Sequence, residues 1–160
     1  MIRSNFFYLF KKRAERSELE CRETELSLLE RNPDAELLDL GCADGSFTMK
    51  AAEKVATQKV YGVDIFDEDI NQAKSRGMDV RRANLNQELP LPKESFDAVI
   101  ASHVIEHLYE TAAFLKEINR IMPIGAYLVI ATPNLAAWHH IVFLLFGKHR
   151  PLPRLVMRCL

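Results

Sequence analysis

The chain has 160 residues, of which 48% are hydrophobic and 27% are charged, and its formal net charge is −1. This length and composition predict one globular domain, 1–160, and the near-zero charge gives no reason to expect nucleic acid as a partner. The three cysteines (Cys21, Cys42 and Cys159) are far apart in the sequence, which disfavours a disulfide framework or a structural zinc site. The same cysteine pattern suits a reducing compartment, so we expect a cytoplasmic protein. No apolar run reaches the ~20 residues of a transmembrane helix.

The N-terminal part, residues 1–35, is predicted to be helical. Residues 1–16 are aromatic and then basic, compatible with a helix packed on a neighbour or a frayed arm. Residues 17–31 have a sparse leucine face among glutamates and arginines, and Asn32-Pro33-Asp34 ends this pattern. We interpret 17–31 as an external helix that covers one side of a sheet.

Strand and helix patterns alternate along the core, residues 36–135. Strands are predicted at 37–40, 59–64, 78–83, 96–102 and 126–131, and helices at 46–56, 67–76 and 111–122, with a last helix at 136–146. A short helix or a longer loop is expected at 104–108. The strand centres are almost continuously apolar, which is typical of a parallel sheet covered on both faces. The fold class is therefore α/β, with a doubly wound parallel sheet of about five strands.

The turn after the first strand is rich in small residues and leads directly into a helix. This arrangement is typical of nucleotide-binding corners. The spacing is Gly41-x-Ala43-x-Gly45, which departs from the Gly-x-Gly-x-x-Gly that cradles a dinucleotide pyrophosphate. Asp64 follows at the end of the second strand, about 20 residues on, where an acid can bind ribose hydroxyls. The pattern favours a nucleoside without a pyrophosphate and disfavours an NAD-dependent oxidoreductase.

At this point the sequence resembles the class I S-adenosylmethionine-dependent methyltransferases, in particular their small-molecule, "type 11"-like subgroup. The resemblance covers about residues 36–135. The segments that carry it are Asp39-x-Gly41-x-Ala43-x-Gly45, Tyr61–Asp64, Ala83–Asn86, Leu89-Pro90, Ser95–Asp97, Ser102–Leu108 and Phe114–Pro123. It implies a Rossmann-like fold, S-adenosyl-L-methionine as cofactor, and methyl transfer to an unidentified small-molecule acceptor.

The resemblance also implies roles for individual residues. Asp39 would hold the cofactor ammonium, the turn would face the methionine and ribose, and Asp64 would accept the ribose hydroxyls. Apolar and amide groups would line the adenine, and the end of the fourth strand would face the transferred methyl group, with His103 as the candidate base. The full set of expected cofactor-binding residues is Asp39, Gly41, Cys42, Ala43, Gly45, Asp64, Ile65, Asn84, Leu85 and Ser102. For Ile65 a place in the core is equally compatible with the sequence.

Three features depart from the family pattern: Ala43 replaces a glycine, Asn84 replaces an acid, and the last two strands of the usual seven are absent. A truncated, non-catalytic cofactor-binding or interaction module is therefore an alternative. The apolar and basic segment 138–158 is interpreted as core packing in a longer parent protein, with membrane-surface contact or self-association as other possibilities.

A His-x-x-Glu-His pattern occurs at His103-x-x-Glu106-His107, which is formally the zinc-binding pattern of one peptidase group. It follows a buried strand rather than lying inside a long helix, and no third ligand is evident after it. We therefore predict no metal, and interpret the segment as a loop on the substrate side with His107 packed or hydrogen-bonded internally.

Overall fold

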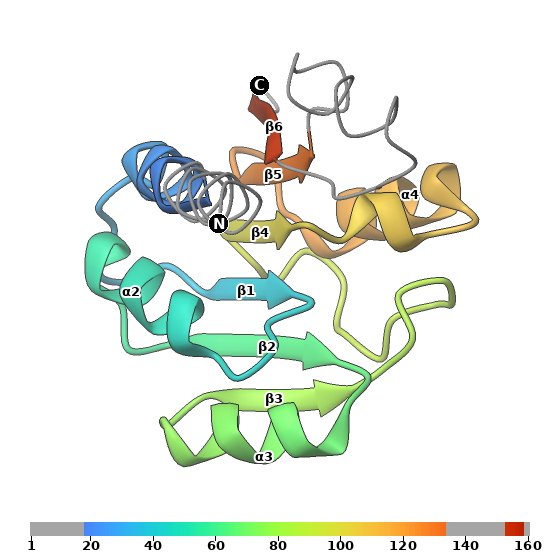
Figure 1. The fold of residues 1–160 in the computed structure, drawn as a ribbon, viewed down its shortest axis with the longest axis horizontal. Helices are drawn as coiled ribbons and strands as arrows, with labels where there is room; N and C mark the ends of the chain where they lie inside the picture. The colour runs from blue at the N-terminus through green and yellow to red at the C-terminus, as the bar shows by residue number, and fades with distance from the viewer. Residues whose placement is uncertain (1–17, 134–152, 159–160) are drawn as a thin grey trace, which may run out of the picture.

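The computed structural model describes residues 18–133 and 153–158, and its centre is a six-stranded sheet (Figure 1). The strand order is β3-β2-β1-β4-β5-β6. The strands are β1 (Leu37–Leu40), β2 (Val60–Asp64), β3 (Asp79–Arg82), β4 (Ala98–Ser102), β5 (Tyr127–Pro133) and β6 (Pro153–Arg158). The first five pair in parallel, which confirms the predicted doubly wound sheet.

The strand β6 was not predicted, and it pairs antiparallel with β5 at the sheet edge. Its sequence begins at Pro153, a residue that lacks an N–H group and is tolerated at the first position of an edge strand. From the sequence alone, Pro151 and Pro153 indicate the end of the preceding helix, and the residues after them are interpreted as a tail. The predicted helix at 136–146 and the N-terminal segment 1–16 lie outside the described residues.

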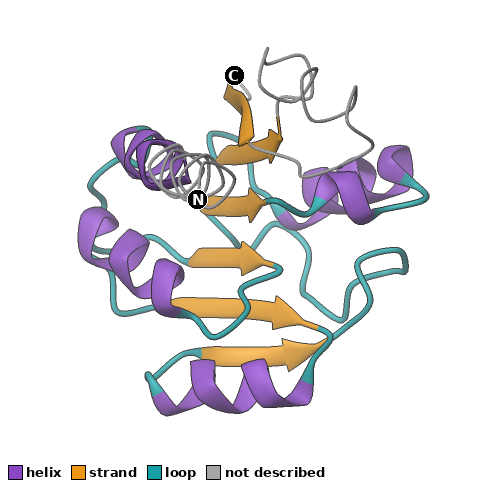
Figure 2. Cartoon of the chain, viewed as in Figure 1, coloured by secondary structure: helices purple, strands orange, loops and turns teal. Residues whose placement is uncertain are grey.

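Helices cover both faces of the sheet (Figure 2). They are helix 18–27, α2 (Ser46–Val55), α3 (Asp67–Ser75) and α4 (Thr111–Ile121), with a 3-10 turn, η1 (Ile105–His107). Side chains of α2, α3 and the segment after helix 18–27 pack in one core cluster, and those of α4 and the loop before β4 pack in a second. Among the described residues, no helix is long and apolar enough to cross a membrane.

The central strand β1 contributes to both core clusters. Leu37 belongs to the cluster with α2 and α3, whereas the next residue, Leu38, belongs to the cluster with α4, and both are fully buried. Successive side chains of a strand point to opposite faces, so a strand buried on both sides needs apolar residues at every position. This explains why β1 is made of leucines apart from Asp39, the pattern that predicted the strand.

The chain reverses its winding direction between β1 and β4. From β1 it proceeds outward to β2 and β3, and then returns to place β4 on the other side of β1. In open parallel sheets, ligands bind outside the carboxyl ends of the strands at such a switch point. The loops that follow β1 and β4 are therefore the first place to look for a site.

Candidate functional site

The turn after β1 alternates left-handed residues. Gly41, Ala43 and Gly45 have φ values of 82°, 45° and 76°. The Gly41 N–H group donates to the Val63 carbonyl oxygen (2.8 Å), which fixes the turn against the end of β2. A Cβ atom at Gly41 would lie 2.6 Å from Cγ2 of Val104, so position 41 needs glycine for space as well as for conformation. The result is a turn whose backbone a ligand can approach closely.

A small cleft of about 60 Å³ opens beside this turn, between helix 18–27 and the ends of β1 and β4. A complete nucleoside ligand needs a pocket of roughly 300–1,000 Å³, so this cleft is sized for one end of such a molecule. Of the expected residues, Asp39, Gly41, Cys42, Ala43 and Ser102 line it, together with Arg22, Asp44, Ser46 and Phe47. The other expected residues (Gly45, Asp64, Ile65, Asn84, Leu85 and His103) do not line the cleft, although several flank it in the sequence.

Arg22 was not predicted as a site residue, and it enters the cleft from helix 18–27. Its Nη1 atom donates to Oγ of Ser102 (3.1 Å), and its guanidinium lies 4.1 Å from the ring centroid of Phe47. These two contacts hold the side chain in place while a guanidinium still has further N–H groups for an anion. The sequence offered no local signal, because an arginine on a charged external helix is ordinary.

Asp39 lies under the cleft and is only 3% exposed. Its Oδ2 atom accepts the hydroxyl of Thr48 (2.6 Å), while Oδ1 has no hydrogen-bond partner among the described residues. Burial raises the pKa of Asp39 to about 6; the Thr48 hydroxyl and Arg22 oppose this rise, and Glu25 and Asp64 add to it. A buried carboxyl with an unused oxygen is suited to accept a cationic N–H donor.

Asp64 at the end of β2 holds three backbone N–H groups. Its Oδ2 accepts from Ala43 (2.9 Å), and its Oδ1 accepts from Ile65 (2.7 Å) and Phe66 (3.0 Å). A carboxylate has about four acceptor positions, so about one remains for a ligand hydroxyl. Asp64 thus fixes the two loops to each other, and its predicted ribose contact stays compatible with this role.

Cys42 is buried and contributes packing rather than thiol chemistry. Its Sγ atom lies where a side chain at Gly62 would be, 2.7 Å from a Cβ built there. Burial, followed by the negative charges of Asp39 and Asp64, raises the pKa of Cys42 to about 12. The thiol therefore stays protonated, and Cys42 can contact a ligand only as an apolar side chain that lines the cleft.

The residues expected on the adenine side differ in their surroundings. Ile65 is 45% exposed and its neighbour Phe66 is 67% exposed, so Ile65 is not a core residue. Leu85 is partly buried and packs on the second core cluster. The Oδ1 atom of Asn84 accepts the backbone N–H of Asn86 (3.0 Å), which leaves the amide N–H groups of Asn84 for a ligand.

His103 follows β4 and has a left-handed backbone, with φ of 56°. Its Nδ1 atom lies 3.6 Å from Oε1 of Glu106, and its Nε2 atom is buried without a hydrogen-bond partner among the described residues. His107, at the end of η1, is exposed, so the expected internal packing of His107 is wrong. The base assignment of His103 is a prediction that this geometry neither requires nor removes.

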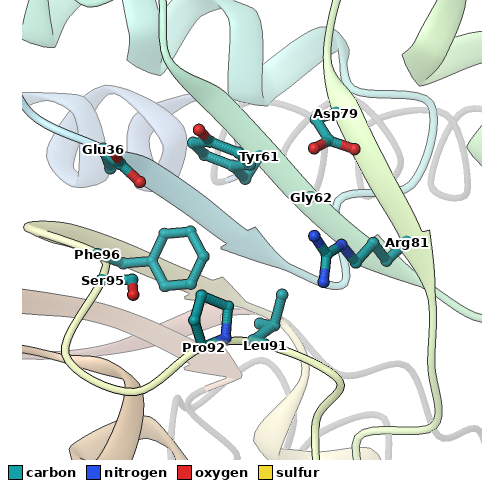
Figure 3. A pocket seen from close by; sticks show the side chains of 9 residues that line it. All are labelled: Glu36, Tyr61, Gly62, Asp79, Arg81, Leu91, Pro92, Ser95 and Phe96. Carbon is teal, nitrogen blue, oxygen red and sulfur yellow. The ribbon is translucent and has the colours of Figure 1, made fainter.

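A second cavity, of about 290 Å³, opens at the opposite ends of the strands (Figure 3). Its walls come from residues near the starts of β2 and β3 and from the segments before β1 and β4, and the rings of Tyr61 and Phe96 meet edge to face there at 5.4 Å. The lining residues are Glu36, Tyr61, Gly62, Asp79, Arg81, Leu91, Pro92, Ser95 and Phe96. This cavity contains none of the expected cofactor residues and lies at the wrong ends of the strands, so we place the site at the smaller cleft.

Comparison with known proteins identifies the family and the fold. The family model described as "Methyltransferase domain" matches residues 38–130, which begin in β1 and end in β5. The chain belongs to this methyltransferase family. The matched range contains all the expected cofactor-binding residues, but it leaves out Arg22.

Several curated relatives have methyltransferase names. A probable S-adenosylmethionine-dependent methyltransferase of Mycolicibacterium smegmatis is 33% identical over 109 residues, which are 67% of this chain and 41% of that protein. The human mitochondrial ubiquinone biosynthesis O-methyltransferase is 28% identical over 121 residues, which are 70% of this chain and 32% of that protein. The chain thus spans about a third to two fifths of the length of these two relatives.

Solved structures give the same fold. An S-adenosylmethionine-dependent methyltransferase of Aquifex aeolicus has a TM-score of 0.63 and 26% identity, covering 78% of this chain and 71% of that one. A geranyl diphosphate C-methyltransferase of Streptomyces coelicolor, solved with S-adenosyl-L-homocysteine, has a TM-score of 0.66 and 19% identity, covering 83% of this chain and 55% of that one. Membership of this methyltransferase family confirms the sequence resemblance, and it does not favour the alternative of a non-catalytic module.

Proposed function

We propose that the chain binds S-adenosyl-L-methionine and forms the cofactor-binding part of a methyltransferase that acts on a small-molecule acceptor. The observation that carries this proposal is the cleft beside the left-handed turn, which presents an acid and an arginine to one small ligand group. Asp39 and Arg22 both line this cleft. An amino acid has one cationic and one anionic group at the same carbon, and this pair of side chains is complementary to it.

The two ends of the methionine group are assigned by charge. The ammonium is assigned to Oδ1 of Asp39, the buried oxygen that lacks a partner. The carboxylate is assigned to Arg22, whose guanidinium is already held by Ser102 and Phe47. Charge-assisted hydrogen bonds of this kind are about twice as strong as neutral ones. The ribose is assigned to Asp64 and the adenine to the exposed surface at Ile65 and Asn84.

A dinucleotide fits the same corner poorly. Helix α2 begins at Ser46, and Oδ1 of Asp44 accepts the Ser46 N–H group (3.1 Å), while Oδ2 of Asp44 pairs with Arg76 (2.8 Å). The hydrogen bond from Ser46, together with Arg76, holds the pKa of Asp44 below its ordinary value. A carboxylate therefore occupies the helix N-terminus, where a pyrophosphate would otherwise bind.

The reaction that this site supports is an in-line displacement. When bound, S-adenosylmethionine supplies an electrophilic methyl group and a neutral thioether leaving group. The residues of the chain fix the position and direction of the cofactor, and such alignment contributes several kcal/mol and up to ~7–11 kcal/mol in ideal cases. Ser102, at the carboxyl end of β4, marks the side on which the acceptor would meet the methyl group. His103 is the proposed base for acceptors that must lose a proton.

Calorimetric titration tests the proposal. Wild-type protein should bind S-adenosylmethionine and S-adenosylhomocysteine but not NAD. Asp64→Asn should weaken binding by about 10–100-fold, because it removes hydrogen bonds to a charged acceptor. The matched control is Asp67→Asn, because the Asp67 side chain is 70% exposed and pairs only with Arg82 at 3.4 Å among the described residues.

The assignment of Arg22 has a test of its own. Arg22→Gln should weaken S-adenosylmethionine binding by about tenfold or more and leave the decarboxylated analogue unaffected, since that analogue has no carboxylate. Equal loss for both ligands would contradict the carboxylate assignment. Failure of wild-type protein to bind either adenosyl ligand at millimolar concentration would overturn the proposed function as a whole.

A further inference from the structure

Three metal-ligating side chains meet behind the cofactor cleft. Cys21, Glu25 and His103 each place one ligand atom so that all three lie within 4.8 Å of one another. Cys21 and Glu25 are four residues apart on helix 18–27 and therefore share one face of it, while His103 approaches from the end of β4. Cys21 and Glu25 are each only 1% exposed. None of the three lines the cleft, although Arg22 and Ser102, which do, are their neighbours in the sequence.

Two buried atoms in this cluster have no hydrogen-bond partner among the described residues. They are Oε2 of Glu25 and Nε2 of His103. The other carboxylate oxygen, Oε1, accepts the Cys21 thiol at 3.4 Å. Buried polar atoms are nearly always satisfied, and leaving a carboxylate oxygen and an imidazole nitrogen without partners is costly. A cation held between the three groups would satisfy both atoms at once.

The orientation of His103 is fixed from behind. Its backbone N–H donates to the Ala131 carbonyl oxygen (2.8 Å), and its φ of 56° is a left-handed conformation that costs about 1–3 kcal/mol and persists only where the surroundings impose it. Its Nδ1 atom faces Oε1 of Glu106 at 3.6 Å. A carboxylate behind one ring nitrogen, with the other nitrogen directed inward, is the arrangement that orients metal-bound histidines.

We propose that Sγ of Cys21, a carboxylate oxygen of Glu25 and Nε2 of His103 bind a divalent transition metal ion of the Zn²⁺ type. Thiolate, imidazole and carboxylate are the ligands that Zn²⁺ takes, and three protein ligands leave one tetrahedral position for water. Tetrahedral Zn²⁺ sets ligand atoms about 3.5 Å apart, so the cluster closes by about 1 Å at its widest. On binding, the Cys21 thiol releases its proton to solvent and the thiolate bonds to the metal ion.

This ligand set differs from the one that the sequence suggested and rejected. The His-x-x-Glu-His pattern directed attention to His103 and His107, and its lack of a third ligand led to the prediction of no metal. The structure replaces His107 with Cys21 and Glu25, about 80 residues earlier in the chain. A metal ion on Nε2 also competes with the proposed base role of His103, because both need the same nitrogen.

Cobalt substitution tests the proposal without reference to methyl transfer. The full 160-residue chain, treated with chelator and then titrated with Co²⁺, should show a near-ultraviolet thiolate-to-cobalt band and the visible bands of tetrahedral Co²⁺. Both should saturate at about one ion per chain and disappear when Zn²⁺ is added. Cys21→Ser should remove the near-ultraviolet band, and Glu25→Gln should weaken metal affinity.

Two further variants keep the result decisive if the buried substitutions prevent folding. Glu106→Gln should lower metal affinity by roughly 10–100-fold while keeping the thiolate band, as expected of a group that only orients a ligand. The matched control is His107→Gln, because His107 is exposed and belongs to the same His-x-x-Glu-His pattern; it should bind like wild type. Absence of a thiolate band in wild-type protein, its persistence in folded Cys21→Ser, or its loss in His107→Gln would overturn the site.

Discussion

Asp39 is the residue whose replacement separates stability from ligand binding. Asp39→Asn keeps the shape of the side chain and an oxygen that can accept the Thr48 hydroxyl, but it removes the ionisation. The folded protein raises the pKa of Asp39 from 3.8 to about 6, chiefly through burial. A carboxyl whose pKa is higher in the folded state favours folding when protonated and disfavours folding when ionised.

The size of this effect follows from the two pKa values. The difference between 3.8 and about 6 corresponds to about 3 kcal/mol of unfolding free energy. This contribution is fully present below about pH 4 and is lost as the pH rises through about 6. An asparagine does not ionise, so Asp39→Asn keeps this free energy at high pH. The variant should therefore match wild type near pH 4 and be more stable by about 3 kcal/mol near pH 8. Cofactor affinity should fall, since the amide cannot offer an ionised oxygen to an ammonium.

Urea unfolding of both proteins from about pH 4 to about pH 8 measures this difference directly. The control is Asp67→Asn, whose side chain is 70% exposed; it should change the unfolding free energy near pH 8 by far less than Asp39→Asn does. Titrating groups far from Asp39 act equally on Asp39→Asn and wild type, so their contributions cancel in the comparison. A stability difference for Asp39→Asn that does not change with pH would refute the reasoning that burial raises this pKa.

Two further predictions concern the same corner. Ala43→Gly should stabilise the fold by about 1 kcal/mol in chemical unfolding, because alanine at φ 45° is strained. Gly41→Ala should destabilise the fold by about 2–4 kcal/mol, because its φ is 82° and the added Cβ would lie 2.6 Å from Cγ2 of Val104. A change of the same sign in both variants would contradict the left-handed turn. Thr48→Val should destabilise the protein by about 1–3 kcal/mol, because it removes the 2.6 Å hydrogen bond to Asp39. The loss should be larger at pH 8 than at pH 5, because the hydrogen bond favours the ionised form of Asp39. A loss of stability that does not depend on pH would indicate a packing effect alone.

The core of the fold was predictable because its strands are buried on both faces. Largely apolar runs such as 37–40, interrupted only by Asp39, and 98–101, each followed by small or polar residues, predict buried parallel strands. The strand β6 had no such signal, because an edge strand that begins at Pro153 does not differ locally from a basic tail. Its position depends on pairing with β5, which is a tertiary interaction.

Part of the site was predictable for a similar reason. Residues that follow parallel strands must turn sharply and face the ligand side, so Gly41 and Asp64 stand out as glycine and acid at the carboxyl ends of strands. Their partners did not stand out. Thr48 is a threonine within a helix, and Arg22 is an arginine on a charged helix, and neither residue type is unusual there. Only the folded arrangement shows that they contact Asp39 and Ser102.

Helix 18–27 therefore has a larger role than its sequence pattern indicated. It was interpreted as a generic cover, yet Arg22 lines the proposed cofactor cleft, while Cys21 and Glu25 lie near His103 behind that cleft. Consecutive helix residues differ in direction by about 100°, so one turn can serve two neighbouring sites. Both sites meet at the carboxyl end of β4, where Ser102, its last residue, accepts a hydrogen bond from Arg22, and His103, the next residue, belongs to the cluster. A change that shifts this helix along the sheet should alter cofactor affinity and metal affinity together. By contrast, a substitution at Arg22 should affect only cofactor affinity, and one at Cys21 only metal affinity.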